Sequence, residues 1–207
     1  MPPVDPRRHS AAAERNRAPI LRELQRLLPA RGGLLLEIAS GTGQHAAHCA
    51  PALAGWTWQP SDADADEGAR ASIAAWCAGL ARVRPPLALD VCSAVWPGVP
   101  PTVDAIFCAN LLHIAPWAVT EALLRGAVRH LVVGGLLLIY GPFLVEGELP
   151  AASNLTFDAD LRARNPAWGL RDLDAVTRSA LSVGMALRER IAMPANNLLL
   201  VFARQAD

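Results

Sequence analysis

The stretch LLLEIASGTGQHA, residues 34–46, constrains the fold more than any other part of the chain. Three leucines lead into Glu37, and such an apolar run predicts a buried parallel strand. Gly41 and Gly43 follow, and a glycine turn at the end of a strand lets the backbone approach a ligand closely. The helix expected next, Gly43–Leu53, would present free N–H groups to a polar or anionic ligand. The segment therefore predicts the strand, turn and helix of a nucleotide-type cofactor site.

Further short apolar strands alternate with predicted helices along the chain. Such alternation is typical of a mostly parallel α/β sheet with right-handed crossovers and helices on both faces. The expected strands are Leu34–Ala39, Trp56–Ser61, Leu87–Val91, Val103–Ala109 and Leu136–Tyr140. The expected helices outside the first motif are Ser10–Leu28, Asp66–Ala81 and Trp117–His130.

The chain changes character after its fifth predicted strand. Residues 143–171 are polar and loop-rich, which predicts a lid or substrate insertion. The elements expected next are a helix over Asp172–Val183 and an antiparallel hairpin of two strands, Met185–Ala192 and Leu198–Arg204. A length of 207 residues suits one sizeable core, so we expect a single domain over 1–207 with a flexible arm over 1–10.

The amino-acid composition argues against several kinds of binding partner and of catalytic chemistry. Nineteen basic and nineteen acidic residues cancel, so no charge excess points to nucleic acid or to an anionic membrane. The chain has no lysine, which removes Schiff-base chemistry on that residue. The four cysteines lack a metal-ligand spacing, and no metal site is expected. Without an apolar leader or a membrane-length run, we expect a cytoplasmic monomer or homodimer that acts on a small molecule.

Acidic side chains follow two of the predicted strands at their carboxyl ends, where doubly wound sheets bind ligands. Asp62 ends the second strand, and its carboxylate can accept hydrogen bonds from both hydroxyls of a ribose. Asp90 ends the third strand, where a carboxylate can accept from an adenine amino group while the Val91 N–H donates to a ring nitrogen. Asp90 could instead be a turn residue. Three neighbours of Asp62 could take its role: Asp64, Asp66 and Glu67.

The end of the fourth predicted strand carries a further polar group. Asn110 and Leu111 would face the middle of the bound cofactor. His113, one helical step on, is a candidate base or lining residue, with a purely structural role as the alternative. The intervals from Glu37 to Asp62 and from Asp62 to Asp90 are each about one strand–helix unit long. This joint pattern indicates a cofactor site more specifically than any one of the three residues does.

The residues from Glu37 to Gly43 resemble motif I of the class I S-adenosylmethionine (SAM) methyltransferases. Ala39 stands where that motif usually has its first glycine, and Gly41 and Gly43 match the other two. The resemblance implies that Glu37 helps to hold the cationic, amino-acid end of the cofactor. The terminal hairpin also fits the sheet of this fold better than a six-stranded dinucleotide-binding sheet.

Several segments together resemble one family of this superfamily. It is a bacterial and animal family catalogued as a domain of unknown function and, in animals, as methyltransferase-like protein twenty-six. The segments are SAAAERNRAPIL, LEIASGTGQHA, WQPSD, NLLHIAPW, YGPF, FDADLRARNPAWGLRD and MPANNL. The resemblance spans residues 10–204 and implies a Rossmann-like class I methyltransferase fold. It implies SAM as cofactor and S-adenosylhomocysteine as product, and it names no acceptor.

The resemblance also suggests roles for residues outside the glycine loop. Glu14, Arg15 and Asn16 would close over the methionine end of the cofactor, since an arginine can pair bidentately with a carboxylate. The alternative is that they form a solvated helix face. His45 belongs to the candidate cofactor site, with a scaffold role as the alternative. The candidates for a general base are His113, Tyr140 and Asp172. We expect the lid or the hairpin turn to line a substrate pocket; their polar residues are Asn154, Trp168, Arg171, Asp172, Asn196 and Asn197.

Two other functions are compatible with the sequence. Residues 41–46 also satisfy the G-x-G-x-x-A pattern of dinucleotide-binding loops, and Asp62 would serve an NAD(P)-dependent oxidoreductase as well. Glu37 inside the strand and the terminal hairpin argue against that function. A non-catalytic protein that binds SAM or a nucleotide would keep the same cofactor residues.

Overall fold

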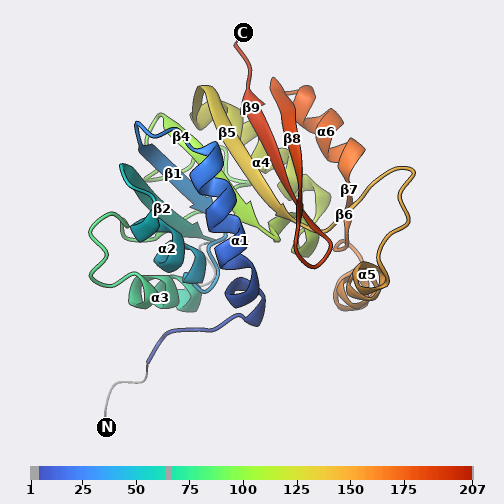
Figure 1. Cartoon of the computed structure of the whole chain (residues 1–207), viewed down its shortest axis with the longest axis horizontal. Helices are drawn as coiled ribbons and strands as arrows, with labels where there is room; N and C mark the ends of the chain where they lie inside the picture. The colour runs from blue at the N-terminus through green and yellow to red at the C-terminus, as the bar shows by residue number, and fades with distance from the viewer. Residues whose placement is uncertain (1–4, 64–66, 207) are drawn as a thin grey trace.

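Seven strands form one sheet in the computed structural model, which describes residues 5–63 and 67–206 (Figure 1). Their order across the sheet is β3-β2-β1-β4-β5-β9-β8. The first five strands run parallel, whereas β9 pairs antiparallel with β5 and with β8. The strands are β1 (Gly33–Ile38), β2 (Trp56–Asp62), β3 (Leu87–Ala88), β4 (Val103–Ala109), β5 (Leu131–Gly141), β8 (Met185–Met193) and β9 (Asn197–Arg204). The predicted mostly parallel sheet with a reversed C-terminal hairpin is confirmed.

Helices cover both faces of this sheet. The α-helices are α1 (Ala11–Leu27), α2 (Gln44–Cys49), α3 (Glu67–Trp76), α4 (Trp117–His130), α5 (Ala152–Arg164) and α6 (Leu173–Leu181). Two 3₁₀ turns, η1 (Ala50–Ala52) and η2 (Leu111–Ile114), follow α2 and β4. A separate pair of short parallel strands, β6 (Phe143–Leu144) and β7 (Arg171–Asp172), flanks α5 in the sequence.

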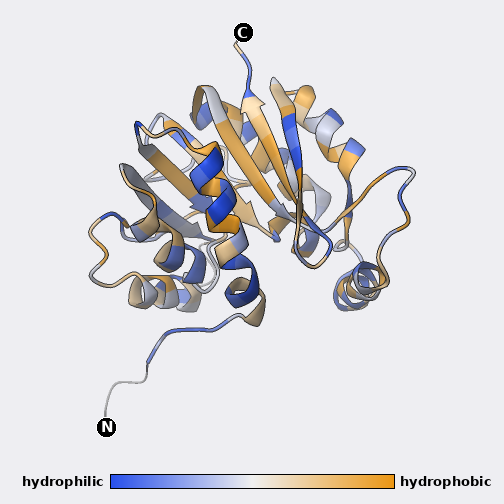
Figure 2. Cartoon of the chain, viewed as in Figure 1, coloured by the Kyte–Doolittle hydropathy of each residue, from blue (hydrophilic) through white to orange (hydrophobic). Residues whose placement is uncertain are grey.

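Two apolar layers hold the helices to the sheet, because successive side chains of a strand point to opposite faces. One layer packs strand residues against α1 and includes Ile20, Leu24, Leu35, Phe107 and Leu138. The other packs strand residues against α4 and α6 and includes Leu36, Ile106, Leu123, Leu137 and Val176. In Figure 2 the central strands are accordingly orange, whereas the outward side of α1 is blue.

The sequence predicted the boundaries of several elements correctly. β4 and α4 span the expected residues, and α1 begins after Ser10, whose hydroxyl accepts the Ala13 N–H at 3.3 Å. α2 is shorter than the expected helix Gly43–Leu53, because Pro51 has no N–H and the chain tightens into η1. α3 also ends early, at Trp76, and the expected start Asp66 lies outside the described residues.

Two strands differ in length from the sequence-based expectation. β3 stops at Ala88 because the following Asp90 closes a turn, in which its Oδ1 accepts the Cys92 N–H at 2.8 Å. β5 begins at Leu131, directly after α4, instead of after the two glycines. Gly134, with φ of 76°, lets the chain shift its register on β4 and continue as a strand.

The segment 143–171 is more helical than the sequence suggests. It contains α5, whose thirteen residues include only two buried ones, Asn154 and Leu161. An apolar stripe is the usual sequence signal of a helix, and α5 lacks one, so the expectation of a loop-rich segment was wrong. The N-terminal arm is also more engaged than expected: the Arg8 N–H donates to Ser72 Oγ at 2.8 Å.

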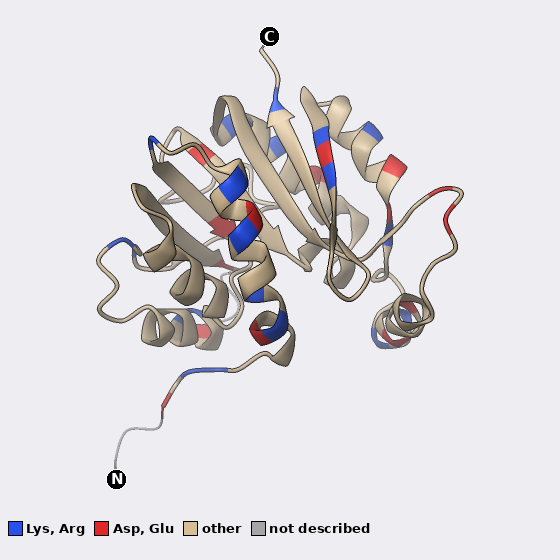
Figure 3. Ribbon diagram, viewed as in Figure 1, with Lys and Arg blue, Asp and Glu red and all other residues tan. Residues whose placement is uncertain are grey.

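Charged residues are spread over the molecule. Figure 3 shows blue and red segments interspersed along α1, α5 and β8, and no single sign of charge gathers on this view. In the part of the chain that the structure describes, no helix combines the length and apolar character needed to cross a membrane.

Candidate functional site

The loop after β1 adopts a backbone that few side chains tolerate. Ala39, Gly41 and Gly43 have φ of 53°, 59° and 90°, in the left-handed region that favours glycine. A Cβ at Gly43 would lie 2.7 Å from the Cα of Ile73 in α3. A Cβ at Gly41 would meet only the Ala39 oxygen, at 4.0 Å. Gly43 is therefore required by packing, and Gly41 leaves open space beside the loop.

Two backbone donors of this loop bond within the protein. The Gly41 N–H donates to Asp62 Oδ2 at 2.7 Å, and the Gly43 N–H donates to the Ser40 carbonyl at 3.0 Å. α2, which follows, has only six residues. These two N–H groups are therefore not free for a ligand. A pyrophosphate, which is held by such groups, would lack both donors here.

Asp62 and Asp90 lie at or just beyond the carboxyl ends of neighbouring strands. Asp62 ends β2 and joins it to the glycine loop; its second oxygen, Oδ1, accepts the Ala63 N–H at 2.9 Å. Asp90 lies two residues beyond β3 in an exposed turn, and Val91 beside it is buried. Of the three neighbours considered for the role of Asp62, Glu67 begins α3, and Asp64 and Asp66 lie outside the described residues.

Glu37 lies inside the protein, behind the glycine loop. It is 1% exposed, and its Oε2 accepts hydrogen bonds from Trp58 Nε1 at 2.9 Å and from Ser40 Oγ at 2.8 Å. Burial raises the pKa of its carboxyl to about 7, against the lowering effect of these two donors. Its Oε1 lies 3.8 Å from His45 Nδ1. Glu37 therefore contacts protein groups and does not line the cavity described next.

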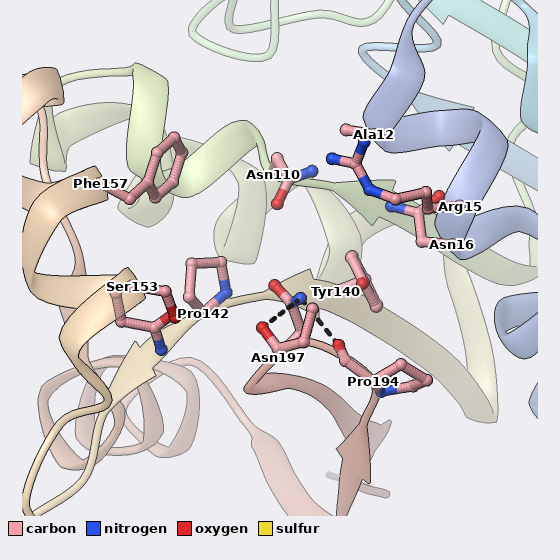
Figure 4. A pocket seen from close by; sticks show the side chains of 12 residues that line it. Ala12, Arg15, Asn16, Asn110, Tyr140, Pro142, Ser153, Phe157, Pro194 and Asn197 are labelled. Atoms are coloured by element: carbon pink, nitrogen blue, oxygen red, sulfur yellow. Dashed lines mark hydrogen bonds between the residues drawn. The ribbon is translucent and has the colours of Figure 1, made fainter.

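A cavity of about 380 Å³ opens between α1, α5 and the turn that joins β8 to β9. Six residues singled out from the sequence line it: Arg15, Asn16, Asn110, Tyr140, Asn154 and Asn197. The other lining residues are Ala12, Pro142, Ser153, Phe157, Pro194 and Ala195. Figure 4 shows them converging from α1, from the ends of β4 and β5, from α5 and from the turn.

The cavity lining combines apolar and polar side chains. Phe157 and Pro142 form apolar walls, and Arg15 contributes the one charged side chain among the lining residues. Arg15 forms no salt bridge with another described residue, whereas Arg17 of the same helix pairs with Glu14. Sequence reasoning missed Phe157, which lies in the FDADLR stretch; no signal in that stretch marked it as a lining residue.

Asn154 of α5 and Asn197 of the β8–β9 turn both line this cavity. Asn154 Nδ2 donates to the Asn196 carbonyl at 3.0 Å, which fastens α5 to the turn. Asn197 Nδ2 donates to the Pro194 and Ala195 carbonyls at 3.0 and 3.1 Å, which shapes the turn itself. Trp168, Arg171 and Asp172 do not line the cavity.

His113 is buried next to the cavity and does not line it. Neither ring nitrogen has a hydrogen-bond partner among the described residues, and the ring lies edge-on to Phe143, with centroids 5.1 Å apart. A Cβ at Gly141 would lie 2.2 Å from His113 Nε2, so glycine is required there by this close approach. Burial, followed by the charge of Arg171, lowers the pKa of His113 to about 3.

The remaining candidates have structural contacts. Asp172 caps α6, because its Oδ1 accepts the Ala175 N–H at 2.7 Å. Arg171 Nε donates to the Leu112 carbonyl at 2.8 Å and so holds η2. Leu111, also in η2, packs against the apolar layer on the α4 side of the sheet.

Solved structures of methyltransferases share this fold. The mitomycin 7-O-methyltransferase MmcR matches with a TM-score of 0.79 and 15% identity, over 94% of this chain and 54% of its own. Human N-acetylserotonin methyltransferase in complex with SAM matches with a TM-score of 0.77 and 14% identity, over 94% and 53%. An O-methyltransferase family protein from Burkholderia thailandensis matches with a TM-score of 0.76 and 18% identity, over 94% and 58%.

These likenesses establish the Rossmann-like methyltransferase fold. The chain spans little more than half the length of each of these proteins. At the level of sequence, a family model matches residues 7–204, nearly the whole chain. The chain therefore belongs to the family described as Protein of unknown function (DUF938).

Proposed function

We propose that this protein transfers a methyl group from SAM to a small-molecule acceptor and releases S-adenosylhomocysteine. One observation carries the proposal: Asp62 is fixed against the Gly41 N–H at the ends of β2 and β1, within a sheet that ends in a reversed hairpin. This arrangement would present a carboxylate to a ribose, and the Gly41 and Gly43 N–H groups, which could contact a pyrophosphate, are already bonded. The methyltransferase fold of the structural neighbours supports the same proposal.

The residues present fit such a cofactor at several points. The open space at Gly41 lets a ligand approach the protein backbone closely. Asp62 would accept hydrogen bonds from the ribose hydroxyls, and Asp90 with Val91 would bind the adenine. Asn110 and Leu111 would lie beside the middle of the cofactor. At its amino-acid end, Arg15 and Asn16, which line the cavity, would contact the cofactor. The other residues singled out for this end would support the loop from within the protein: Glu37, Ala39, Gly43 and His45.

The acceptor would occupy the cavity beside Asn110. Its volume of about 380 Å³ is within the range of sites for small ligands. Bound SAM supplies an electrophilic methyl group, and the protein contributes orientation of the acceptor and exclusion of water. Asn110, held at φ of 60° at the end of β4, and Tyr140 would orient the acceptor. Phe157 and Pro142 would exclude water.

A general base is the least supported part of this site. A pKa lowered to about 3 keeps His113 neutral at physiological pH and makes it a weak base. Asp172 is engaged in capping α6. Tyr140 lines the cavity, so of the three candidates it has the best access to an acceptor. We therefore infer that orientation, more than proton abstraction, limits the reaction.

A labelled-methyl assay tests the proposed function. The protein is incubated with SAM carrying an isotopically labelled methyl group and a panel of small phenols and carboxylic acids. We expect label in at least one acceptor and a matching amount of S-adenosylhomocysteine. Tight binding of SAM without transfer to any acceptor would favour a non-catalytic SAM-binding protein. Binding of NADH in place of SAM would favour the oxidoreductase.

A further inference from the structure

A second cavity, of about 260 Å³, adjoins the first at the turn between β8 and β9. Asn154 of α5 and Asn197 of the turn line both cavities. Asn154 Nδ2 donates to the Asn196 carbonyl at 3.0 Å, and Asn196 Nδ2 donates to Ser153 Oγ at 3.3 Å. The two spaces therefore meet at a boundary that hydrogen bonds between α5 and the turn hold together.

Few contacts stabilise this boundary on the side of α5. The helix buries only Asn154 and Leu161 of its thirteen residues. Asn196, which takes part in both hydrogen bonds, is exposed, so water can replace a partner that either bond loses. A ligand that is longer than the first cavity can therefore extend past the boundary at a small cost in protein contacts.

The second cavity is lined mainly by apolar side chains. Phe143 belongs to β6, Leu198 belongs to β9, and Met193 ends β8. Glu148 is the one charged residue of the lining, and its Oε1 accepts a hydrogen bond from Arg190 Nη1 at 2.9 Å. The other polar residues of the lining are the asparagines at the boundary. Beyond the boundary, a bound group would therefore be stabilised chiefly by burial of apolar surface.

Under the proposed function, two molecules share the first cavity. Arg15 and Asn16 would contact the amino-acid end of the cofactor there, and the acceptor would lie beside Asn110 in the same space of about 380 Å³. An acceptor larger than a single small ring must then extend beyond this space. The second cavity, which shares Asn154 and Asn197 with the first, is the adjoining room for it.

We propose that the two cavities form one acceptor site, in which the methyl-accepting group lies beside Asn110 and an apolar tail the size of a short alkyl chain fills the second cavity. The acceptor is then an elongated amphipathic molecule. Its role as acceptor rests on the proposed function. Binding of an apolar tail in the second cavity can be tested without methyl transfer.

Two methionines at the ends of β8 provide a reporter and its control. Met193 lines the second cavity, whereas Met185 is fully buried in the apolar layer on the α4 side. The protein is labelled with ¹³C at the methionine methyl groups, and Met193→Leu identifies the signal of that residue. The labelled protein is titrated with phenol and with 4-butylphenol, with and without S-adenosylhomocysteine. We expect 4-butylphenol to shift the Met193 signal and not that of Met185, and phenol to shift neither.

The length of the tail provides a quantitative test. Each methylene that is buried from water should tighten binding about fourfold along the series 4-ethylphenol, 4-propylphenol and 4-butylphenol. Ala151→Leu places a larger side chain in the second cavity and should remove this gain, with the binding of phenol unchanged. Ala152→Leu is the matched control, because the neighbouring Ala152 is exposed and lines neither cavity.

Two results would overturn the inference. One is an unmoved Met193 signal at the highest soluble concentration of 4-butylphenol. The other is the same gain per methylene in folded Ala151→Leu as in wild type, which would mean that the tail binds elsewhere.

Calorimetry with S-adenosylhomocysteine on the same samples tests the cofactor separately. A Met193 shift in a protein that does not bind S-adenosylhomocysteine would support the apolar site and contradict the proposed methyl transfer. Binding of S-adenosylhomocysteine with an unmoved Met193 signal would support the cofactor site and reject the second cavity as part of the acceptor site.

Discussion

The two halves of the candidate site are built in different ways. The loop half consists of residues 37–46 with Asp62 and Asp90, and most of it is contiguous in the chain. Its donors and acceptors bond largely to one another, as Gly41 does to Asp62. The cavity half draws on α1, β4, β5, α5 and the β8–β9 turn, and its Arg15 forms no salt bridge with another described residue. We therefore expect the loop half to be the more rigid of the two, and the cavity half to determine which small molecule is bound.

The largest expected effect tests the rigidity of the loop half. Gly43→Ala should lower the free energy of unfolding by about 3 kcal/mol or more, because its Cβ would meet the Ile73 backbone at a left-handed φ. Gly41→Ala, with open space around its Cβ, should cost only about 1 kcal/mol. Urea unfolding of both variants measures the difference. Equal losses would show that packing does not distinguish the two glycines.

A second prediction concerns the pair Glu37 and His45, which lies within the loop half. Burial raises the pKa of Glu37 from 4.5 to about 7 and lowers that of His45 from 6.5 to about 4. The native state holds the Glu37 proton more tightly than the unfolded chain does, so this stabilisation is complete below pH 4.5 and lost as the pH rises to 7. For His45 the sign is opposite, and stability is lost as the pH falls from 6.5 to 4.

Two variants separate these opposing contributions. Relative to wild type, Glu37→Gln should gain about 3 kcal/mol of stability as the pH rises from 4.5 to 7. His45→Gln should gain a similar amount, about 3 kcal/mol, as the pH falls from 6.5 to 4. Urea unfolding at each pH measures both, and comparison with wild type cancels the contribution of His113. Parallel pH profiles for wild type and Glu37→Gln would contradict the assigned burial of that carboxyl.

How much of the site the sequence could predict follows from this contrast. The strand, the glycines and the strand-end aspartates are adjacent in the chain or separated by whole strand–helix units, so periodicity alone locates them. The engagement of Gly41 with Asp62 was not visible, because a pattern of residue types does not say which N–H groups are already bonded. The 3₁₀ turn at Pro51 and the turn at Asp90 shortened α2 and β3 for equally local reasons.

The cavity could be predicted only in part. Asn154 and Asn197 were expected near a pocket, yet nothing in the sequence says that they meet Arg15 and Tyr140. α5 escaped notice because it buries too few side chains to carry an apolar stripe. Phe157 therefore lay in a segment that the sequence predicted to be polar and rich in loops. Elements held by few contacts give the weakest sequence signal, and here such an element forms part of the cavity wall.

The smallest expected effect concerns how α5 is held. Asn154→Ala removes the hydrogen bond to the Asn196 carbonyl and should cost about 1 kcal/mol locally. We expect faster amide hydrogen exchange in α5, with exchange in α1 unchanged. Thr156→Ala is the matched control, because its hydroxyl bonds only to Ala152 in the same helix. Equal exchange in both variants would mean that Asn154 does not fasten α5 to the turn.

The central claim is that the loop half binds the ribose and adenine of SAM, whereas the part of the cavity half that includes Phe157 binds the acceptor. Calorimetric titration with S-adenosylhomocysteine of wild type, Asp62→Ala and Phe157→Ala tests it most directly. We predict micromolar binding by wild type, at least about tenfold weaker binding by Asp62→Ala through loss of charge-assisted hydrogen bonds, and unchanged binding by Phe157→Ala. Absence of binding by the folded wild type, or equal weakening in both variants, would contradict the account.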